Sequence, residues 1–250
     1  MEREAPISEH SQIILVWLSL TMTTVFGISL GLLLHMIPPP AANQTAEQIK
    51  DWYLSRQSEI KIGATIASWS AASILPFWAV TAIQIGRHEK GRRIWAVIAA
   101  MSGAMMTIFL VLPPLCFGTA AFAPERAADV TALMHQFGVL ALVTTDQYYV
   151  FGFVAVAVAC LLPHRVEHSA FPRWFGWFTI WLTVMAEAGA LAFNLRTGPF
   201  AWNGLFVFWI PFGFFAPWLI AASYLLIRSL KRQIADSTHS EQPSPAQASA

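Results

Sequence analysis

The stretch QFGVLALVTTDQYYVFGFVAVAVACLL, residues 136–162, is an apolar run with a polar interruption at its centre. It exceeds the roughly 20 residues that a helix needs to cross the hydrocarbon core of a bilayer. Asp146 places a carboxylate in the middle of this run, and Gln147, Tyr148 and Tyr149 follow it directly. A charged group at such a depth is costly and is usually kept for a pathway, a ligand or a partner. The stretch therefore predicts a membrane-spanning helix that contains a polar site.

The composition of the whole chain indicates the same class of protein. Of its 250 residues, 56% are hydrophobic and 12% are charged, and the mean hydropathy is +0.54. An ordinary soluble domain has about 25% charged residues. The formal net charge of +1 provides no basic surface for nucleic acid, so we expect no nucleic-acid partner. We predict an all-α integral membrane helical bundle whose main partner is the lipid bilayer.

Apolar runs near the membrane-spanning length recur along the chain, and at such lengths a single segment satisfies its backbone hydrogen bonds internally only as a helix. Pro113 and Pro114 are expected to bend or end the third of these helices, because proline lacks an N–H donor. Gly27 and Gly31 form a GxxxG pattern in the first, which permits close helix approach. We predict six transmembrane helices, at about residues 13–36, 62–85, 94–117, 136–162, 174–195 and 202–227.

Basic residues predict the orientation of these six helices. With the N-terminus inside, the cytoplasmic segments hold ten Lys and Arg residues and the outer loops hold five, which favours two cytoplasmic termini. The densest basic run is residues 87–93. Residues 1–12 then form a cytoplasmic N-terminus, 13–232 the six-span domain, and 233–250, rich in Ser, Pro, Gln and Ala, a disordered cytoplasmic tail. The first apolar run is too long for a cleavable signal peptide.

The polar residues within or beside the predicted spans gather toward the outer half of the membrane. Counting along the helices places Asp146 and Glu187 there, which fits a pocket open to the outside better than a channel. Each of these polar residues also has a structural explanation: it stabilises the helical bundle, or it lies at the membrane interface, where a polar group has a low energetic cost. The candidate ligand-binding residues are Asp146, Glu187, Tyr148, Tyr149, His35, His135 and Asn203.

Recognisable catalytic and cofactor motifs are missing from the sequence. No phosphate loop, HExxH or CxxC occurs, and no pair among the histidines and carboxylates of the candidate set has the helical spacing of metal ligands. We therefore expect no metal and no cofactor. The aromatic residues of the fifth and sixth spans favour lipid contact and packing, with an apolar ligand pocket as the alternative.

The segment RTGPFAWNGLFVFWIP, residues 196–211, resembles the closing segment of a group of uncharacterised bacterial multi-span membrane proteins. Residues 121–126, AFAPER, are similar to an element of the same group. The resemblance covers most of the fourth to sixth spans. It implies a multi-pass protein of the bacterial inner membrane and transfers no site chemistry.

Three functions remain open at this point. The leading interpretation is binding or transport of a small apolar molecule through an outward-facing pocket with Asp146 and Glu187. The second is an accessory or structural subunit that packs against a membrane protein partner or another copy of the chain. The third is a membrane enzyme that uses the two carboxylates. Carboxylates that face the interior favour the first or third function, whereas carboxylates that face lipid favour the second.

Overall fold

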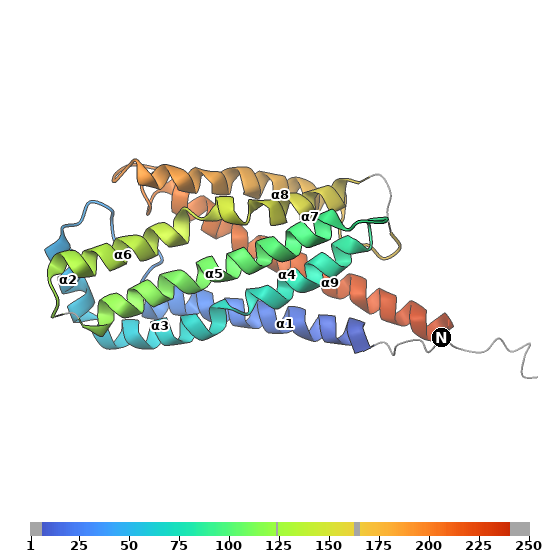
Figure 1. The fold of residues 1–250 in the computed structure, drawn as a ribbon, viewed down its shortest axis with the longest axis horizontal. Coiled ribbons are helices and arrows are strands. Elements are labelled where there is room, and N and C mark those ends of the chain that lie inside the picture. Colours follow the sequence, from blue (N-terminus) through green and yellow to red (C-terminus); the bar gives the residue numbers. More distant parts are fainter. Residues whose placement is uncertain (1–6, 124, 163–165, 241–250) are drawn as a thin grey trace, which may run out of the picture.

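The computed structural model describes residues 7–123, 125–162 and 166–240, and within these ranges all regular structure is helical. The long helices run roughly side by side along one axis and form an elongated bundle (Figure 1). In chain order the elements are α1 (Ile7–Ile28), η1 (Ser29–Leu33), α2 (Ala46–Ser55), α3 (Gln57–Ala71), α4 (Ile74–Gly86), α5 (Ile94–Phe122), α6 (Ala128–Val143), η2 (Asp146–Tyr148), α7 (Val150–Leu161), α8 (Arg173–Ala186), η3 (Glu187–Phe193), η4 (Leu205–Trp209) and α9 (Ile210–Ser240).

The all-α prediction is confirmed for the described residues, and the membrane-spanning length is confirmed for five segments. By length and composition these could each cross a membrane, which is consistent with an integral membrane protein: Glu9–Leu33, Gln57–Gly86, Ile94–Phe122, Arg173–Phe193 and Leu205–Ser237. The second of them contains both α3 and α4. Two shorter apolar helices, α6 and α7, occupy the place of the predicted fourth span.

Three sequence predictions need correction. The fourth span is not one continuous helix, because the α-helix is interrupted between Val143 and Val150. This interruption is called the break below. The third helix does not end at its prolines or near residue 117. Pro113 and Pro114 are buried inside α5, which continues to Phe122. The chain is also helical at residues 233–240, where a disordered tail was expected; residues 241–250 lie outside the described ranges. Gln233 donates to Gln84 and Ser229 there, which ties this last part of α9 to the bundle.

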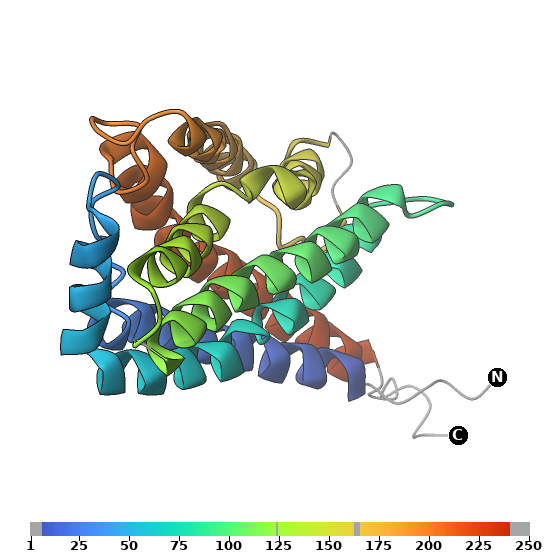
Figure 2. The same ribbon diagram turned by 60° about the vertical axis from the view of Figure 1, so that its left-hand side comes forward.

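The two ends of the bundle differ in what they contain. The first turn of α1, the turn between α4 and α5, and the last turn of α9 lie toward the same end (Figure 1). The short helix α2 lies across the opposite end, as the rotated view shows (Figure 2). A Thr45–Gln48 capping box starts α2: the Thr45 hydroxyl accepts from the Gln48 N–H, and the Gln48 side chain accepts from the Thr45 N–H.

Two separate hydrophobic cores fill the bundle. The first is centred on Trp78 and Trp218, and the second on Phe117 and Tyr53. Both indoles of the first core find hydrogen-bond acceptors: Trp78 Nε1 donates to Met106 Sδ at 3.2 Å, and Trp218 Nε1 donates to Thr179 Oγ1 at 2.9 Å. A buried indole N–H ordinarily needs such a partner. The two cores leave between them the region in which the break between α6 and α7 lies.

Trp78 fits the first core because glycines face it from two helices. A methyl group on Gly103 of α5 would lie 2.2 Å from Trp78 Cβ, and one on Gly152 of α7 would lie 2.9 Å from Trp78 Cη2. Real side chains do not tolerate such approaches, so both positions depend on the absence of a Cβ. This packing holds α4, α5 and the first turn of α7 together, directly after the break.

Candidate functional site

The break begins where two threonines turn their side chains back onto α6. Thr144 Oγ1 donates to the Leu140 carbonyl at 2.7 Å, and Thr145 Oγ1 donates to the Ala141 carbonyl at 2.8 Å. Hydroxyl groups that bond to the carbonyl four residues earlier often bend a helix. A single 3₁₀ turn, η2, follows and starts at Asp146. The carboxylate therefore lies in an interruption of the helix instead of on the side of a regular one.

Glu187 also lies where a helix changes its geometry. α8 ends at Ala186, and the chain continues as the 3₁₀ helix η3 from Glu187. Gly189 of η3 packs directly on the break, because a methyl group there would lie 2.0 Å from the Val143 carbonyl oxygen. This close contact brings the two irregular segments together, and the carboxyl groups of Asp146 and Glu187 lie close enough to interact electrostatically.

The two carboxyl groups have few polar contacts. The Tyr149 hydroxyl donates to Asp146 Oδ1 at 2.6 Å. Oε1 of Glu187 is buried and has no hydrogen-bond partner in the described part of the chain. Within the same residues, neither carboxylate forms an ion pair with Lys, Arg or His. Carboxyl groups taken out of water ordinarily have ionic or hydrogen-bonding partners, and this pair has no basic partner within the described residues.

Beside the break lies a cavity of about 680 Å³. Its walls come from α1, η1, α5, both sides of the break, α8, η4 and α9, and they are almost entirely apolar. Besides Asp146 and Tyr149, the polar lining residues are Thr23 and Thr24. Small-molecule sites commonly measure about 300–1,000 Å³ and combine apolar walls with a few polar groups. The volume and lining of this cavity match that description.

The GxxxG glycines have a different role from the one that the motif suggests. Both Gly27 and Gly31 line the cavity, and no heavy atom lies within 4 Å of a Cβ position on Gly27. A Cβ on Gly31 would contact the Ile37 side chain at 3.2 Å. Gly27 therefore leaves space open in the cavity wall, whereas Gly31 packs against Ile37, and the glycines bring no second helix close within the described part of the chain.

The structure divides the sequence-predicted site residues among several places. Asp146 and Tyr149 line the cavity. Glu187 lies near Asp146 but is not part of the cavity lining. Tyr148 turns away from them: its side chain is 58% exposed and stacks on Phe109 with ring centroids 4.6 Å apart. Two neighbouring tyrosines thus have opposite environments, because the 3₁₀ turn directs them to different sides.

The two histidines lie near α2, apart from the cavity lining. His35 Nε2 lies 2.7 Å from Glu59 Oε2. His135 is fully buried, and its Nδ1 is 3.2 Å from the Tyr53 hydroxyl while its Nε2 has no partner in the described structure. Burial raises the pKa of Tyr53 above its ordinary value, with Cys116 adding to the shift, so the phenol keeps its proton. Asn203 lies in the turn before η4, outside the cavity lining.

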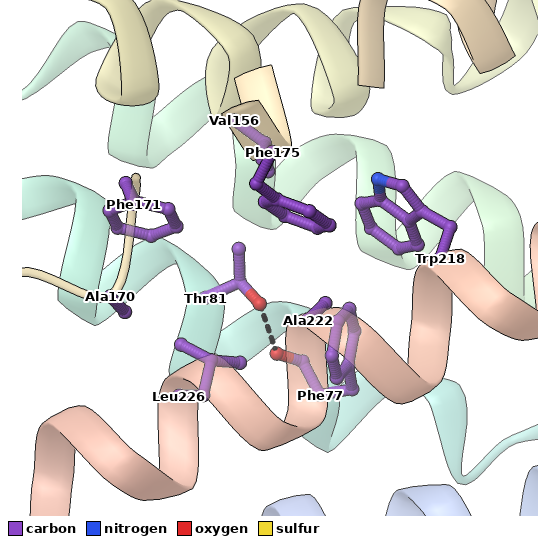
Figure 3. Close-up of a pocket in the computed structure, with 9 residues that line it drawn as sticks. All are labelled: Phe77, Thr81, Val156, Ala170, Phe171, Phe175, Trp218, Ala222 and Leu226. Atoms are coloured by element: carbon purple, nitrogen blue, oxygen red, sulfur yellow. Dashed lines mark hydrogen bonds between the residues drawn. The ribbon is translucent and has the colours of Figure 1, made fainter. Parts of the chain in front are cut away.

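A second, much smaller void lies inside the first core, between Thr81, Phe171, Phe175 and Trp218 (Figure 3). Its volume of about 10 Å³ is that of a single water molecule at most. Phe175 and Trp218 stack with centroids 5.6 Å apart, and the Thr81 hydroxyl donates to its own helix, at the Phe77 carbonyl. This void is a packing imperfection and not a ligand site.

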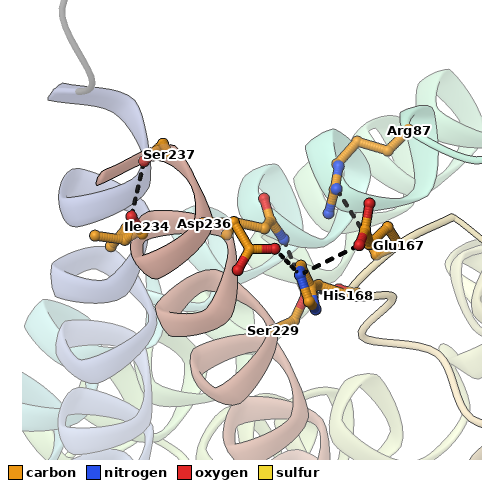
Figure 4. A network of polar contacts seen from close by, with 8 residues as sticks. Arg87, Glu167, His168, Ser229, Ile234, Asp236 and Ser237 are labelled. Atoms are coloured by element: carbon orange, nitrogen blue, oxygen red, sulfur yellow. Dashed lines mark hydrogen bonds and ion pairs between the residues drawn. The ribbon is translucent and has the colours of Figure 1, made fainter. Parts of the chain in front are cut away.

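At the end of the bundle that carries the basic run, a polar network joins α4, the segment before α8, and α9 (Figure 4). Arg87 donates to Gln84 Oε1 at 3.1 Å and to the Glu167 carbonyl at 3.2 Å. Burial lowers the pKa of Arg87, and Glu9 acts in the opposite direction. Side-chain ligand atoms of Glu167, His168 and Asp236 lie within 4.8 Å of one another. Sequence reasoning missed this cluster, since its members have no motif spacing.

That cluster could offer three ligands to a metal ion, but its contacts have a simpler explanation. His168 and Asp236 bond directly to each other, and both carboxylate residues are exposed. Exposed acidic groups near a histidine are ordinary features of a protein surface. The arrangement serves to attach α9 to the segment that leads into α8.

No family model, no curated protein and no solved structure matches the chain. The class of the protein therefore follows from its own geometry: it is an α-helical protein with helices of membrane-spanning length. Its distinguishing features are a broken helix, a pair of carboxyl groups at the break, and an apolar cavity beside them.

Proposed function

We propose that this chain is an integral membrane protein that binds, and carries through the bilayer, a small and largely apolar molecule in the cavity beside Asp146. The observation that supports this proposal is the cavity itself, whose volume of about 680 Å³ suits a drug-sized ligand. The single carboxylate in its wall supplies one polar contact that fixes the orientation of the ligand.

The proposed topology has six passes, with α6 and α7 together forming the fourth. Both are apolar, and together with the break they replace the predicted continuous span. The turn with the basic run lies toward the same end as the start of α1 and the last turn of α9, as two cytoplasmic termini require (Figure 1). Basic residues favour the cytoplasmic side. The proposed location is the bacterial inner membrane, because residues 196–211 resemble a segment of bacterial multi-span membrane proteins.

The directions of the carboxyl groups favour a binding role over that of an accessory subunit. Carboxylates that faced lipid would need a partner protein to cover them. Here Asp146 lines the cavity with Tyr149 donating to its carboxyl group, and Oε1 of Glu187 is buried within the chain. A membrane partner or a second copy of the chain remains compatible with this role without being needed to shield the acids.

The cavity lining also favours binding over catalysis. Its polar side chains are those of Asp146, Tyr149, Thr23 and Thr24, and it contains no histidine, cysteine or lysine. The hydroxyl of Thr24 donates to the Leu20 carbonyl at 2.8 Å, as a structural group does. The described lining therefore lacks the cysteine, serine and lysine nucleophiles that many enzymes use, and its hydroxyl beside a carboxyl group is that of Tyr149 at Asp146.

The proposal is tested by filling the cavity. Gly27→Phe places a ring in open space within the cavity, and Gly213→Phe is the matched control on α9, since Gly213 also has no heavy atom within 4 Å but lies outside the lining. Binding of the neutral fluorophore diphenylhexatriene is measured by energy transfer from tryptophan in lipid nanodiscs. We expect affinity to fall about tenfold or more, which is at least 1.4 kcal/mol, in Gly27→Phe alone.

Equal affinity in the wild type and Gly27→Phe, with both variants eluting as folded protein, would contradict a ligand site in this cavity. Mass spectrometry of molecules that copurify with the wild type and not with Gly27→Phe would identify the natural ligand class.

A further inference from the structure

We infer that the ligand of this cavity is a lipophilic cation, with an apolar body against the helix walls and a positively charged amine or quaternary ammonium group at Asp146. This inference rests on the proposed binding function and adds the charge of the ligand. Three independent observations lead to it: the missing counter-charge, the aromatic walls, and the side on which the cavity opens.

The first observation is the uncompensated acidic pair. Gly189 packs beside Asp146 and thereby places Glu187 at the same junction, and neither carboxyl group has a basic partner in the described residues. The cavity lining itself contains no Lys, Arg or His. A cationic ligand would supply the missing charge, whereas an anionic ligand would add repulsion in apolar surroundings, where Coulomb interactions are stronger than in water.

The second observation is the aromatic character of the lining. Phenylalanines from α1, α7, η4 and α9 line the cavity together with Tyr149. Phe208 and Phe212 are stacked, with ring centroids 5.3 Å apart. Aromatic faces attract cations, and quaternary ammonium groups are often bound by clusters of such rings. An apolar wall made of leucine and valine alone would give no preference for positive charge.

The volume excludes a bare inorganic cation as the main occupant. Metal ions are held by oxygen ligands at about 2.0–2.6 Å, which requires several polar groups around one small point. This cavity measures about 680 Å³ and has its polar lining limited to four side chains. Such a space fits an organic cation whose apolar groups occupy the remainder.

The third observation concerns the route into the cavity. Ile28 and Leu32 are 54% and 70% exposed, and Ile220 of α9 is 58% exposed, although all three line the cavity. The cavity therefore reaches the lateral surface of the bundle beside α1 and α9. In a membrane that surface faces lipid. An amphiphilic cation dissolved in the bilayer could enter there without crossing water.

The test compares three probes that share one apolar body: the trimethylammonium derivative of diphenylhexatriene, its neutral parent, and its propionate derivative. Each is titrated into the purified full chain in zwitterionic nanodiscs, and tryptophan-to-probe energy transfer is measured. The signal that survives in Gly27→Phe is subtracted as lipid background. We expect the cation to bind about tenfold or more tightly than the neutral probe, and the anion most weakly.

Asp146→Asn keeps the shape of the side chain and removes its charge. We expect it to abolish the preference for the cation over the neutral probe. Wild-type protein that binds the neutral probe as tightly as the cation would overturn the inference and leave the proposed function intact. If none of the three probes binds the wild type more than it binds Gly27→Phe, both the inference and the proposed function are overturned. The ranking in the wild type decides the question even if Asp146→Asn does not fold.

Discussion

Gly189 lies against the main-chain carbonyl of Val143 so closely that a methyl group on the glycine would be 2.0 Å from the carbonyl oxygen and 3.2 Å from Asp146 Oδ2. This contact joins η3 to the broken helix and thereby brings Glu187 near Asp146. The acidic pair is thus a product of close backbone packing between segments that are distant in sequence.

Replacing Gly189 with alanine should separate these two segments. Because the clash is with a backbone oxygen, which cannot rotate away, we expect a loss of stability of about 1–3 kcal/mol, the usual cost of overpacking. Thermal unfolding in detergent measures it. Gly213→Ala is the control, since that position has open space. Equal melting temperatures for the wild type and Gly189→Ala would show that the break moves freely.

The tyrosines at the break offer a matched pair of substitutions. Tyr149→Phe removes the hydroxyl that donates to Asp146 Oδ1 at 2.6 Å, whereas Tyr148→Phe alters a ring that stacks on Phe109 and is 58% exposed. Removing one partner of a buried hydrogen bond costs about 1–3 kcal/mol, because the other polar group is left unsatisfied. We expect Tyr149→Phe to lower the melting temperature and alter cation binding, and Tyr148→Phe to do neither. Identical behaviour of the two variants would argue against a specific Asp146–Tyr149 pair.

The buried pair Tyr53 and His135 should behave as a unit. Tyr53→Phe leaves His135 Nδ1 without its partner at 3.2 Å, and His135 already has an unpaired Nε2. An unsatisfied buried polar group costs about 1–3 kcal/mol, whereas replacing both partners with apolar groups costs much less. We therefore expect Tyr53→Phe/His135→Phe to melt closer to the wild type than the sum of the single variants predicts. Additive single effects would show that the two side chains do not interact.

The proposed topology is accessible to cysteine labelling. Both native cysteines, Cys116 and Cys160, are buried, so background labelling is low. Lys90 lies exposed in the basic turn, and Asp51 lies exposed on α2 at the opposite end. An impermeant maleimide applied to intact cells should label Asp51→Cys and should reach Lys90→Cys only after permeabilisation. Labelling of Lys90→Cys in intact cells would reverse the orientation.

The sequence predicted the helices well wherever apolar length alone decides the structure. Five predicted spans correspond to helical segments of membrane-spanning length. The predicted end of the third helix was wrong, because proline stops a helix in water but is tolerated where packed neighbours surround it. Pro113 and Pro114 are buried in this way.

The structure places the residues of the predicted site in different surroundings. The polar run at residues 146–149 was expected inside a continuous helix, and the structure instead breaks the helix there, with Asp146 and Tyr149 in the lining of the cavity. Tyr149 and Tyr148 could not be distinguished from the sequence, since the directions of their side chains depend on the 3₁₀ turn. It also grouped His35, His135 and Asn203 with the carboxylates on depth alone, although none of them lines the cavity.

By itself, then, the sequence determined the helical class, the membrane-spanning lengths and the position of the polar interruption, because hydrophobicity and backbone hydrogen bonding act locally along the chain. Tertiary structure alone decided that Glu187 meets Asp146 and that Gly27 opens into a cavity. Those features depend on contacts between α1, η3, α9 and the broken helix, and close packing between distant segments has no signature in the local pattern of residues.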